Sequence, residues 1–255
     1  MSSLLICSWL IFTSIFQYGD AIYRGMPVTS DFYYMVRIKG IMPECSGTII
    51  SNVHILTSAQ CVYNKTRNNL LIIHDRDPMH VQHRHVRAIF LHPLYNHRHR
   101  GIYTYATTYN DIAVLKMSRA LSSSEYLTVL ELPKVDLKPP YILCGIAGWG
   151  ATQPHNPYSR NGLYWCFLDV LSPDECAELG RKNRANEFCA MDRNDGSLPL
   201  EGDEGSPVIC DGHLVGMYTR PFTNEIIDVQ EYINHPAVFM KIIPYVPFIN
   251  SAMNL

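Results

Sequence analysis

The sequence lacks an excess of charge of either sign. Its 21 Lys and Arg residues nearly balance its 23 Asp and Glu residues, and the formal net charge is −2. Such a chain has no overall positive field that would attract DNA, RNA or an anionic membrane surface. With 47% hydrophobic residues in 255, it is also unlike a disordered or collagen-like chain. We therefore expect a globular protein with no nucleic-acid partner.

Long apolar runs are missing as well. Residues 4–16 form a run of thirteen that is too short to span a bilayer. The run is followed by Gly19, Asp20 and Ala21, whose small-x-small form is typical of a signal-peptidase site, although no basic residue precedes it. The alternative, a buried N-terminal strand, would rarely begin at the initiator Met. We expect residues 1–21 to be a secretory signal and residues 22–255 to be an extracellular domain with no membrane span.

Closely spaced cysteine pairs are also absent, which argues against a structural zinc site. Beyond Cys7 in the expected signal, the chain has seven cysteines, which is typical of a secreted protein. Seven cysteines predict three disulfides and one unpaired thiol.

The sequence does contain many short apolar segments separated by Gly, Pro, Asn and Asp, a pattern typical of an all-β protein. Each half of the chain has six such segments, which predicts two six-stranded units. The expected strands are residues 32–38, 45–51, 53–57, 70–74, 86–92 and 112–117, then 141–149, 163–171, 187–191, 207–210, 213–219 and 237–242.

Residues 122–138 are polar and proline-bearing, and their composition is that of a linker between the two units. This places the first unit at about 22–121, the second at about 139–243, and a C-terminal helix at 244–255. Ser172, followed by Pro173 and with Glu175 at the third helical position, predicts the start of another short helix.

Six segments together resemble the landmarks of the chymotrypsin-like serine protease family. They are SGTII at 46–50, TSAQC at 57–61, LHPLY at 91–95, NDIAVL at 110–115, CGIAGWG at 144–150 and GDEGSP at 202–207. One such match is weak, but six in the right order are specific, and the resemblance runs from residue 22 to the C-terminus. It implies two six-stranded antiparallel β-barrels with the active site between them.

The catalytic positions depart from that family. Its reaction needs a hydroxyl nucleophile, an imidazole base and a buried carboxylate that orients the imidazole. The matching residues here are Glu204, Gln60 and Asp111, so only the carboxylate remains. An amide cannot accept a proton from an alcohol, and Ser58 and Ser206 are offset from the matching positions. The resemblance therefore implies a homologue without protease activity.

The resemblance carries over other functional positions. The backbone N–H groups of Gly202 and Glu204 match the oxyanion hole, where the Glu204 carboxylate would be a resident anion. Ile22 matches the new N-terminus of an activated protease, and Asp203 matches the acid with which that terminus pairs. The specificity-pocket and substrate-strand positions match Leu198, Thr219, Arg220 and Pro221, of which Pro221 has no N–H group to donate.

The resemblance also implies the disulfide pairing. It pairs Cys45 with Cys61, Cys144 with Cys210, and Cys176 with Cys189, and it leaves Cys166 over. We expect Cys166 to be a buried free thiol, with an intermolecular bridge as the alternative. Separately, Asn64 begins the sequon NKT, which predicts a glycan in a secreted protein.

Histidine is concentrated between residues 74 and 99, which contain seven of the eleven. His83 and His85 share one face of a strand, and His97 and His99 repeat the spacing, so these residues are candidates for a zinc or copper site. Histidines in such a pattern are more often solvated surface side chains. We therefore expect no metal and no cofactor.

The sequence thus predicts a secreted, inactive serine protease homologue that binds extracellular proteins such as proteases, zymogens or inhibitors. It would act as a cofactor or competitor in a protease cascade. One alternative is a hydrolase with non-standard catalysis through Asp111 and Glu204, as in glycosidases, or through a His-bound metal. A second is an antimicrobial binding protein, but that type relies on strong basic charge, which this chain lacks.

No Arg or Lys precedes Ile22, so signal cleavage after Ala21 would expose the Ile22 amine without a zymogen step. We predict that N-terminal sequencing of the secreted protein begins at Ile22, because this amine is expected to pair with Asp203. Cleavage after Gly19 would instead require an aminodipeptidase to remove two further residues. A stable mature chain that begins elsewhere would contradict the prediction.

Overall fold

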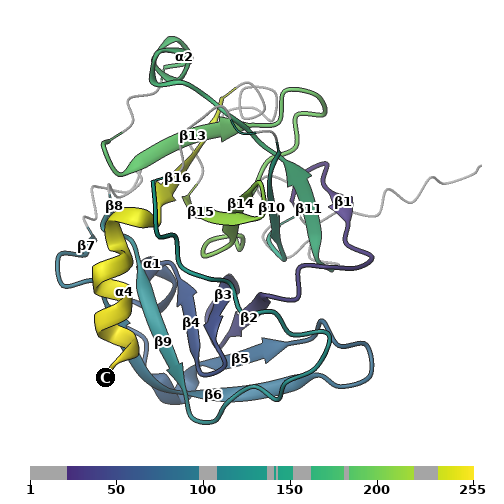
Figure 1. Ribbon diagram of the computed structural model, residues 1–255, viewed down its shortest axis with the longest axis vertical. Helices are drawn as coiled ribbons and strands as arrows, with labels where there is room; N and C mark the ends of the chain where they lie inside the picture. Colours follow the sequence, from purple (N-terminus) through teal and green to yellow (C-terminus); the bar gives the residue numbers. More distant parts are fainter. Residues whose placement is uncertain are drawn as a thin grey trace, which may run out of the picture.

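The computed structural model describes residues 22–97, 108–136, 141, 143–151, 162–180, 184–220 and 235–255. The expected signal, residues 1–21, lies outside the described residues. The strands form one antiparallel sheet in each half of the chain, together with a small ribbon of β7 (Asn96–His97) and β8 (Thr108–Tyr109) that the sequence did not predict (Figure 1).

The first half forms a closed barrel with the strand order β2-β3-β4-β9-β6-β5. Its strands correspond to the six expected segments, but β2 begins at Met35 rather than at residue 32, and β6 begins at Gln82 rather than at residue 86. Because β6 begins earlier than expected, the histidines near its start belong to the barrel wall. The strands are β2 (Met35–Lys39), β3 (Cys45–Ser51), β4 (His54–Thr57), β5 (Leu71–His74), β6 (Gln82–Leu91) and β9 (Ala113–Met117).

Strand β3 (CSGTIIS) is buried on both of its faces over residues 45–50, although its sequence mixes apolar and small polar residues. Ile49 packs inside the barrel with Ile55 and Leu115. The next residue, Ile50, packs in a second cluster with Met217 from the other half of the chain. Because side chains alternate across a strand, the two faces of β3 contribute to two separate cores. This double burial holds the two halves together.

The second half, together with β1 from the N-terminal segment, forms a barrel-like sheet with the order β1-β11-β10-β14-β15-β16-β13-β12. The strand expected at residues 163–171 is divided at the buried Leu168, whose N–H group donates to the Cys144 carbonyl at 3.0 Å. Its two parts, β11 and β12, are consecutive in the chain yet lie far apart in the strand order, so the sheet curls back on itself. The fold class expected from the sequence is confirmed. The strands are β1 (Met26–Pro27), β10 (Cys144–Gly148), β11 (Tyr164–Phe167), β12 (Asp169–Val170), β13 (Glu187–Met191), β14 (Pro207–Cys210), β15 (His213–Arg220) and β16 (Ala237–Lys241).

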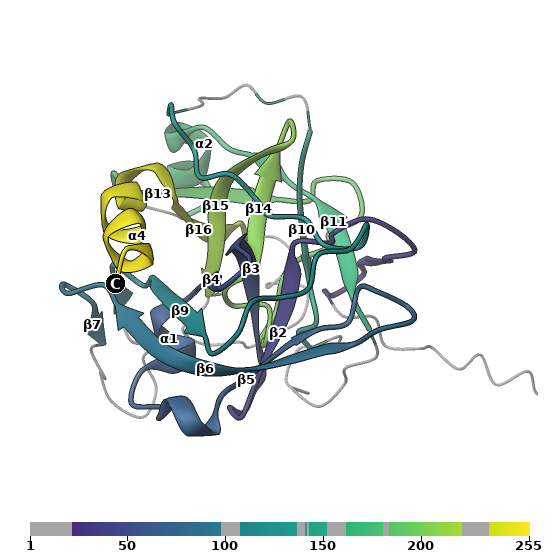
Figure 2. The ribbon, with the colours of Figure 1, turned by 60° about the horizontal axis from the view of Figure 1, so that its bottom comes forward.

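The helices are short. Helix α2 (Pro173–Glu178) begins as expected, because the Ser172 hydroxyl accepts from the Glu175 N–H while the Glu175 carboxylate accepts from the Ser172 N–H. The C-terminal helix α4 (Val246–Met253) packs against β9 (Figures 1 and 2). In the part of the chain that the structure describes, no helix is long and apolar enough to cross a bilayer. The others are α1 (Ala59–Val62), η1 (Arg67–Asn69) and η2 (Ile243–Tyr245).

Residues 122–136, most of the expected linker, contain no helix or strand. Within this segment the Thr128 N–H donates to the Tyr33 carbonyl at 3.2 Å, and the Leu130 N–H donates to the Ile49 carbonyl at 2.9 Å. The segment is therefore fixed along the first barrel on its way to the second. The last two residues of the expected linker, 137 and 138, lie outside the described residues.

All three expected disulfides are present: Cys45–Cys61, Cys144–Cys210 and Cys176–Cys189. The third joins residues 13 positions apart, and closing a loop of this length contributes about 3 kcal/mol in the chain-entropy model. Cys166 is a free thiol in β11, and burial raises its pKa well above the ordinary value. A buried, protonated thiol is a poor nucleophile, so Cys166 acts as an apolar residue of the core.

Candidate functional site

The three positions that the resemblance matches to the catalytic residues meet between the two barrels. Gln60 lies in α1 directly after β4, Asp111 lies just before β9, and Glu204 lies in the turn before β14. The Gln60 backbone N–H donates to Asp111 Oδ1 at 2.8 Å. Gln60 and Glu204 both line a cavity of about 270 Å³. The structure therefore brings together the three positions that the resemblance indicates.

Asp111 is buried, with 3% of its surface exposed. Its Oδ1 atom accepts hydrogen bonds from the Gln60 backbone and, at 2.8 Å, from the Ser58 hydroxyl. In the family this carboxylate orients an imidazole, whereas here it fixes the first turn of α1. Asp111 thus helps to hold the segment from Ser58 to Gln60 in place.

The Gln60 side chain closes part of the site. Its Nε2 group donates to the main-chain carbonyl of Thr219, in the strand that matches the substrate-binding edge of the family. That carbonyl is therefore already paired within the protein. Arg220 ends β15, and nothing is described of its side chain. Pro221 lies outside the described residues.

The turn that carries Glu204 needs glycine on both sides. Gly202 and Gly205 have φ values of +100° and +88°, which favour glycine strongly. A side chain at position 205 would also collide with the carbonyl oxygen of Ser46. A hydrogen bond accompanies this close approach: the Ser46 N–H donates to the Glu204 carbonyl at 2.9 Å. The turn is thus pressed against β3 of the first barrel.

The Glu204 carboxyl group occupies the oxyanion-hole position. The Gly202 N–H donates to Glu204 Oε2 at 2.7 Å, and only 8% of Glu204 is exposed. Burial raises the pKa of Glu204 to about 8, although hydrogen bonds from its own N–H and from Gly202 act in the opposite direction. This raised pKa favours the neutral carboxylic acid at neutral pH over the expected resident anion, because burial outweighs the two hydrogen bonds.

Asp203 anchors the same turn from inside. Its Oδ1 accepts from the Gly150 N–H at 2.7 Å, and its Oδ2 accepts from the Leu200 N–H at 2.9 Å. A side chain at Gly148 or Gly150 would collide with this carboxyl group, so the glycines of the CGIAGWG segment make room for it. Ile22 and Asp203 are both fully buried, as the expected N-terminal ion pair requires. The pair itself stays a prediction.

The expected specificity pocket is lined by apolar side chains and backed by a tyrosine. Leu198 and Leu200 are buried and pack with Ala151. Tyr218, directly before Thr219 in β15, is fully buried, and its hydroxyl donates to the Pro199 carbonyl at 3.1 Å. Its side chain therefore spans from the strand to the pocket loop. The sequence analysis missed Tyr218, although a large residue next to the matched substrate strand could have indicated it.

The remaining predicted sites lie away from this cleft. His83 and His85 are exposed on β6, and within the described ranges no group of three His, Cys, Asp or Glu residues could hold a metal. The His97 side chain and all of His99 lie outside the description. Asn64 is exposed in the turn after α1, so its side chain is accessible for glycosylation, which stays a prediction.

Comparison with known proteins agrees with this geometry. The family model described as Trypsin matches residues 22–249. Human Kallikrein-10 is 25% identical over 92% of this chain and 82% of its own length. Mouse Granzyme E is 26% identical over 88% and 85%. The solved structure of neuropsin, a serine protease expressed in the limbic system of mouse brain, superposes with a TM-score of 0.73 at 20% identity, over 91% of this chain and 100% of that one.

The two barrel-like sheets define a protein of the chymotrypsin-like fold. The match over residues 22–249 goes further than the fold: the chain belongs to the trypsin-like serine protease family.

The raised pKa of Glu204 makes stability depend on pH. The stability that comes from protonated Glu204 is complete below its ordinary pKa of 4.5 and is lost as pH rises through about 8. Glu204→Gln removes the titration and keeps an acceptor for the Gly202 N–H. We predict little difference from wild type at pH 5, but a variant more stable by roughly 3–5 kcal/mol at pH 9, as measured by urea unfolding.

Glu178→Gln, at an exposed carboxylate in α2, is the matched control and should show no pH-dependent difference. An equal effect of Glu204→Gln at both pH values would show that Glu204 does not titrate in this range.

Proposed function

We propose that this protein is a catalytically inactive member of its family and that it acts by binding extracellular proteins. The observation that carries the proposal is the hydrogen bond from the Gly202 N–H to the Glu204 carboxyl group. In the family, this N–H stabilises the oxyanion that forms in the transition state. Here a side chain of the same turn occupies the donor, in place of a nucleophile.

The loss of both reacting groups is the chemical support. In subtilisin, removal of either the nucleophile or the base costs about a million-fold in kcat. The neighbouring hydroxyls do not replace them, because Ser58 donates to Asp111 and Ser206 is fully buried. Ser206 faces the interior beside Gly148 rather than the cleft. Proteolysis by the family mechanism therefore has no nucleophile and no base.

Binding in the manner of a substrate is also obstructed. The Thr219 carbonyl, which would pair with an extended peptide, accepts from Gln60 instead. Tyr218 reaches the loop of the specificity pocket from behind. A partner would therefore contact the rim of the cleft rather than insert a side chain into the specificity pocket.

The rim beside the degenerate site offers a suitable surface. Met42 is 71% exposed at the cavity that Gln60 and Glu204 line, and Lys65 and Glu201 are exposed at its edge. Met is enriched in protein interfaces, and a polar, solvent-accessible rim surrounds their apolar core. We propose that proteases, zymogens or protease inhibitors of the extracellular fluid are the partners.

One observation favours the second candidate, a non-standard hydrolase. With its pKa raised to about 8, Glu204 is protonated at neutral pH, as a general acid must be. However, the adjoining cavity of about 270 Å³ is smaller than the roughly 300–1,000 Å³ of typical ligand sites. Asp111 Oδ1, the partner carboxylate, already accepts two hydrogen bonds. We therefore place binding ahead of hydrolysis.

Affinity capture tests the proposal. The mature protein, immobilised and exposed to its own extracellular fluid, should enrich proteases, zymogens or inhibitors. Met42→Asp should reduce that capture at least about tenfold, because it places a charge in the apolar part of the rim. Met79→Asp is the matched control, since Met79 is 80% exposed and does not line the cavity. Capture without these protein classes, or capture that the two variants reduce equally, would refute the proposed partners or the proposed surface.

A further inference from the structure

A second, larger cavity lies in the second half of the molecule. Its volume is about 600 Å³, and it shares no lining residue with the cavity at the degenerate site. Strands β12, β13 and β15, the start of η2 and the end of the described linker form its walls. The walls are mainly apolar and include Val170, Leu171, Phe188, Leu214, Val215 and Ile243.

A cavity of this size and composition is typical of a site for a small molecule. Such sites measure roughly 300–1,000 Å³ and combine an apolar lining with a few polar groups that fix the ligand's orientation. The degenerate site falls below that range, and this cavity falls in the middle of it. The polar groups at its wall therefore indicate which class of ligand would fit.

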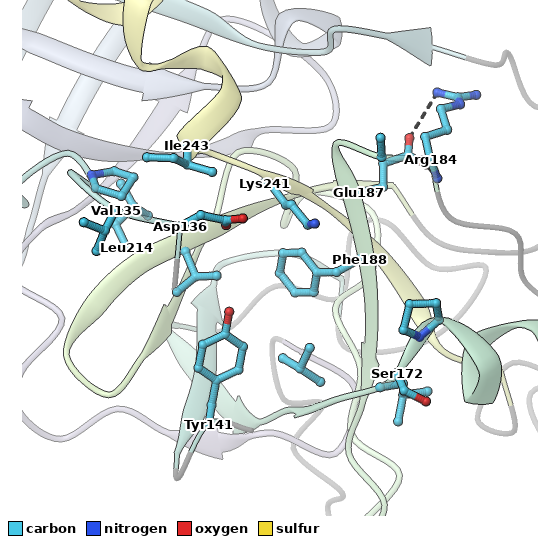
Figure 3. A pocket seen from close by; sticks show the side chains of 16 residues that line it. Val135, Asp136, Tyr141, Ser172, Arg184, Glu187, Phe188, Leu214, Lys241 and Ile243 are labelled. Carbon is cyan, nitrogen blue, oxygen red and sulfur yellow. Dashed lines mark hydrogen bonds and ion pairs between the residues drawn. The ribbon is translucent and has the colours of Figure 1, made fainter. Parts of the chain in front are cut away.

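Lys241 is the polar group best placed to fix a ligand. Figure 3 shows its ammonium group directed into the cavity beside the ring of Phe188. The described residues provide no ion-pair partner for Lys241, because the nearby Glu187 carboxylate pairs with Arg184 at 3.0 Å. Figure 3 also shows that the Arg184 side chain is directed away from the cavity. A partly buried ammonium group without a counter-ion favours an anion.

We propose that this cavity binds an amphipathic carboxylate of the medium-chain fatty acid class. The alkyl chain packs among the apolar side chains, and the carboxylate pairs with the Lys241 ammonium group. Burial of each methylene group contributes favourably in such a lining. Pairing the anion with Lys241 gives a counter-ion to an ammonium group that forms no ion pair with the described residues of the wall.

The negative charge of Asp136 would weaken the binding of an anion, so its removal should change the affinity in the direction opposite to the removal of the Lys241 charge. Its carboxylate also lines the cavity, but the residue is exposed, so solvent and salt screen its charge more than that of Lys241. Removal of each charge should consequently change the affinity for a carboxylate in opposite directions. A simple apolar cavity would respond to neither.

The experiment measures displacement of a fluorescent fatty-acid probe from the purified mature protein by dodecanoate and by the neutral dodecanol. Lys241→Met should weaken dodecanoate binding about tenfold and leave dodecanol binding unchanged. Asp136→Asn should make dodecanoate binding a few-fold tighter, because it removes the opposing charge. Lys134→Met, at an exposed lysine outside the cavity, is the control and should change nothing.

Val215→Phe and, independently, Val170→Phe add a ring inside the cavity and should weaken both ligands. Unchanged melting temperatures would show that each variant folds, and the second filling variant serves if the first does not. No displacement by dodecanoate up to about 1 mM in wild type, or equal dodecanoate affinity in Lys241→Met, would overturn the proposal. These outcomes do not depend on whether the degenerate site is inactive.

Discussion

The site depends above all on the buried carboxyl group of Asp203. An acidic side chain with no solvent exposure is costly unless its oxygens are hydrogen-bonded. The Gly150 and Leu200 N–H groups meet that need, and the absence of side chains at positions 148 and 150 provides the space. These contacts fix the turn at residues 202–206 against the end of β10. The position of Glu204 follows from them.

The same constraint explains how the turn keeps its shape without the family's catalytic residues at the matched positions. The groups that hold the turn are Asp203, the glycines and the contacts with Ser46, and none of them is a reacting group. The residues at the positions that the resemblance matches to the reacting groups have partners within the protein. Gln60 bonds to the Thr219 carbonyl, and Glu204 bonds to the Gly202 N–H. The fold of the family is thus retained, while two backbone groups that line the cleft are paired with side chains of the protein itself.

Much of the fold could be predicted because local sequence and tertiary packing agree. The paired Ile49 and Ile50 of β3 face the two cores on either side of the strand, and α2 follows from the reciprocal Ser172 and Glu175 hydrogen bonds. The disulfide pairing came from the resemblance rather than from spacing. The break at Leu168 was not predicted, because it depends on a hydrogen bond to Cys144, a residue remote in sequence.

The sequence predicted which residues lie at the site, but it predicted their protonation states and contacts only in part. Motif order located Gln60, Asp111 and Glu204, and the structure brings these positions together. The neutral state of Glu204 could not be read from the sequence, since it results from the competition between burial and hydrogen bonding. Tyr218 was missed because its reach to Pro199 depends on how β15 lies against the pocket loop.

A turnover measurement tests the central claim most directly. The mature protein would be incubated with a panel of peptide and glycoside substrates and with a fluorophosphonate probe for activated serine. The account predicts product release no faster than in buffer, and no labelling, because the cleft has neither a nucleophile nor a base. Turnover that copurifies with the protein and disappears in folded Asp111→Asn or Glu204→Gln variants would contradict the account.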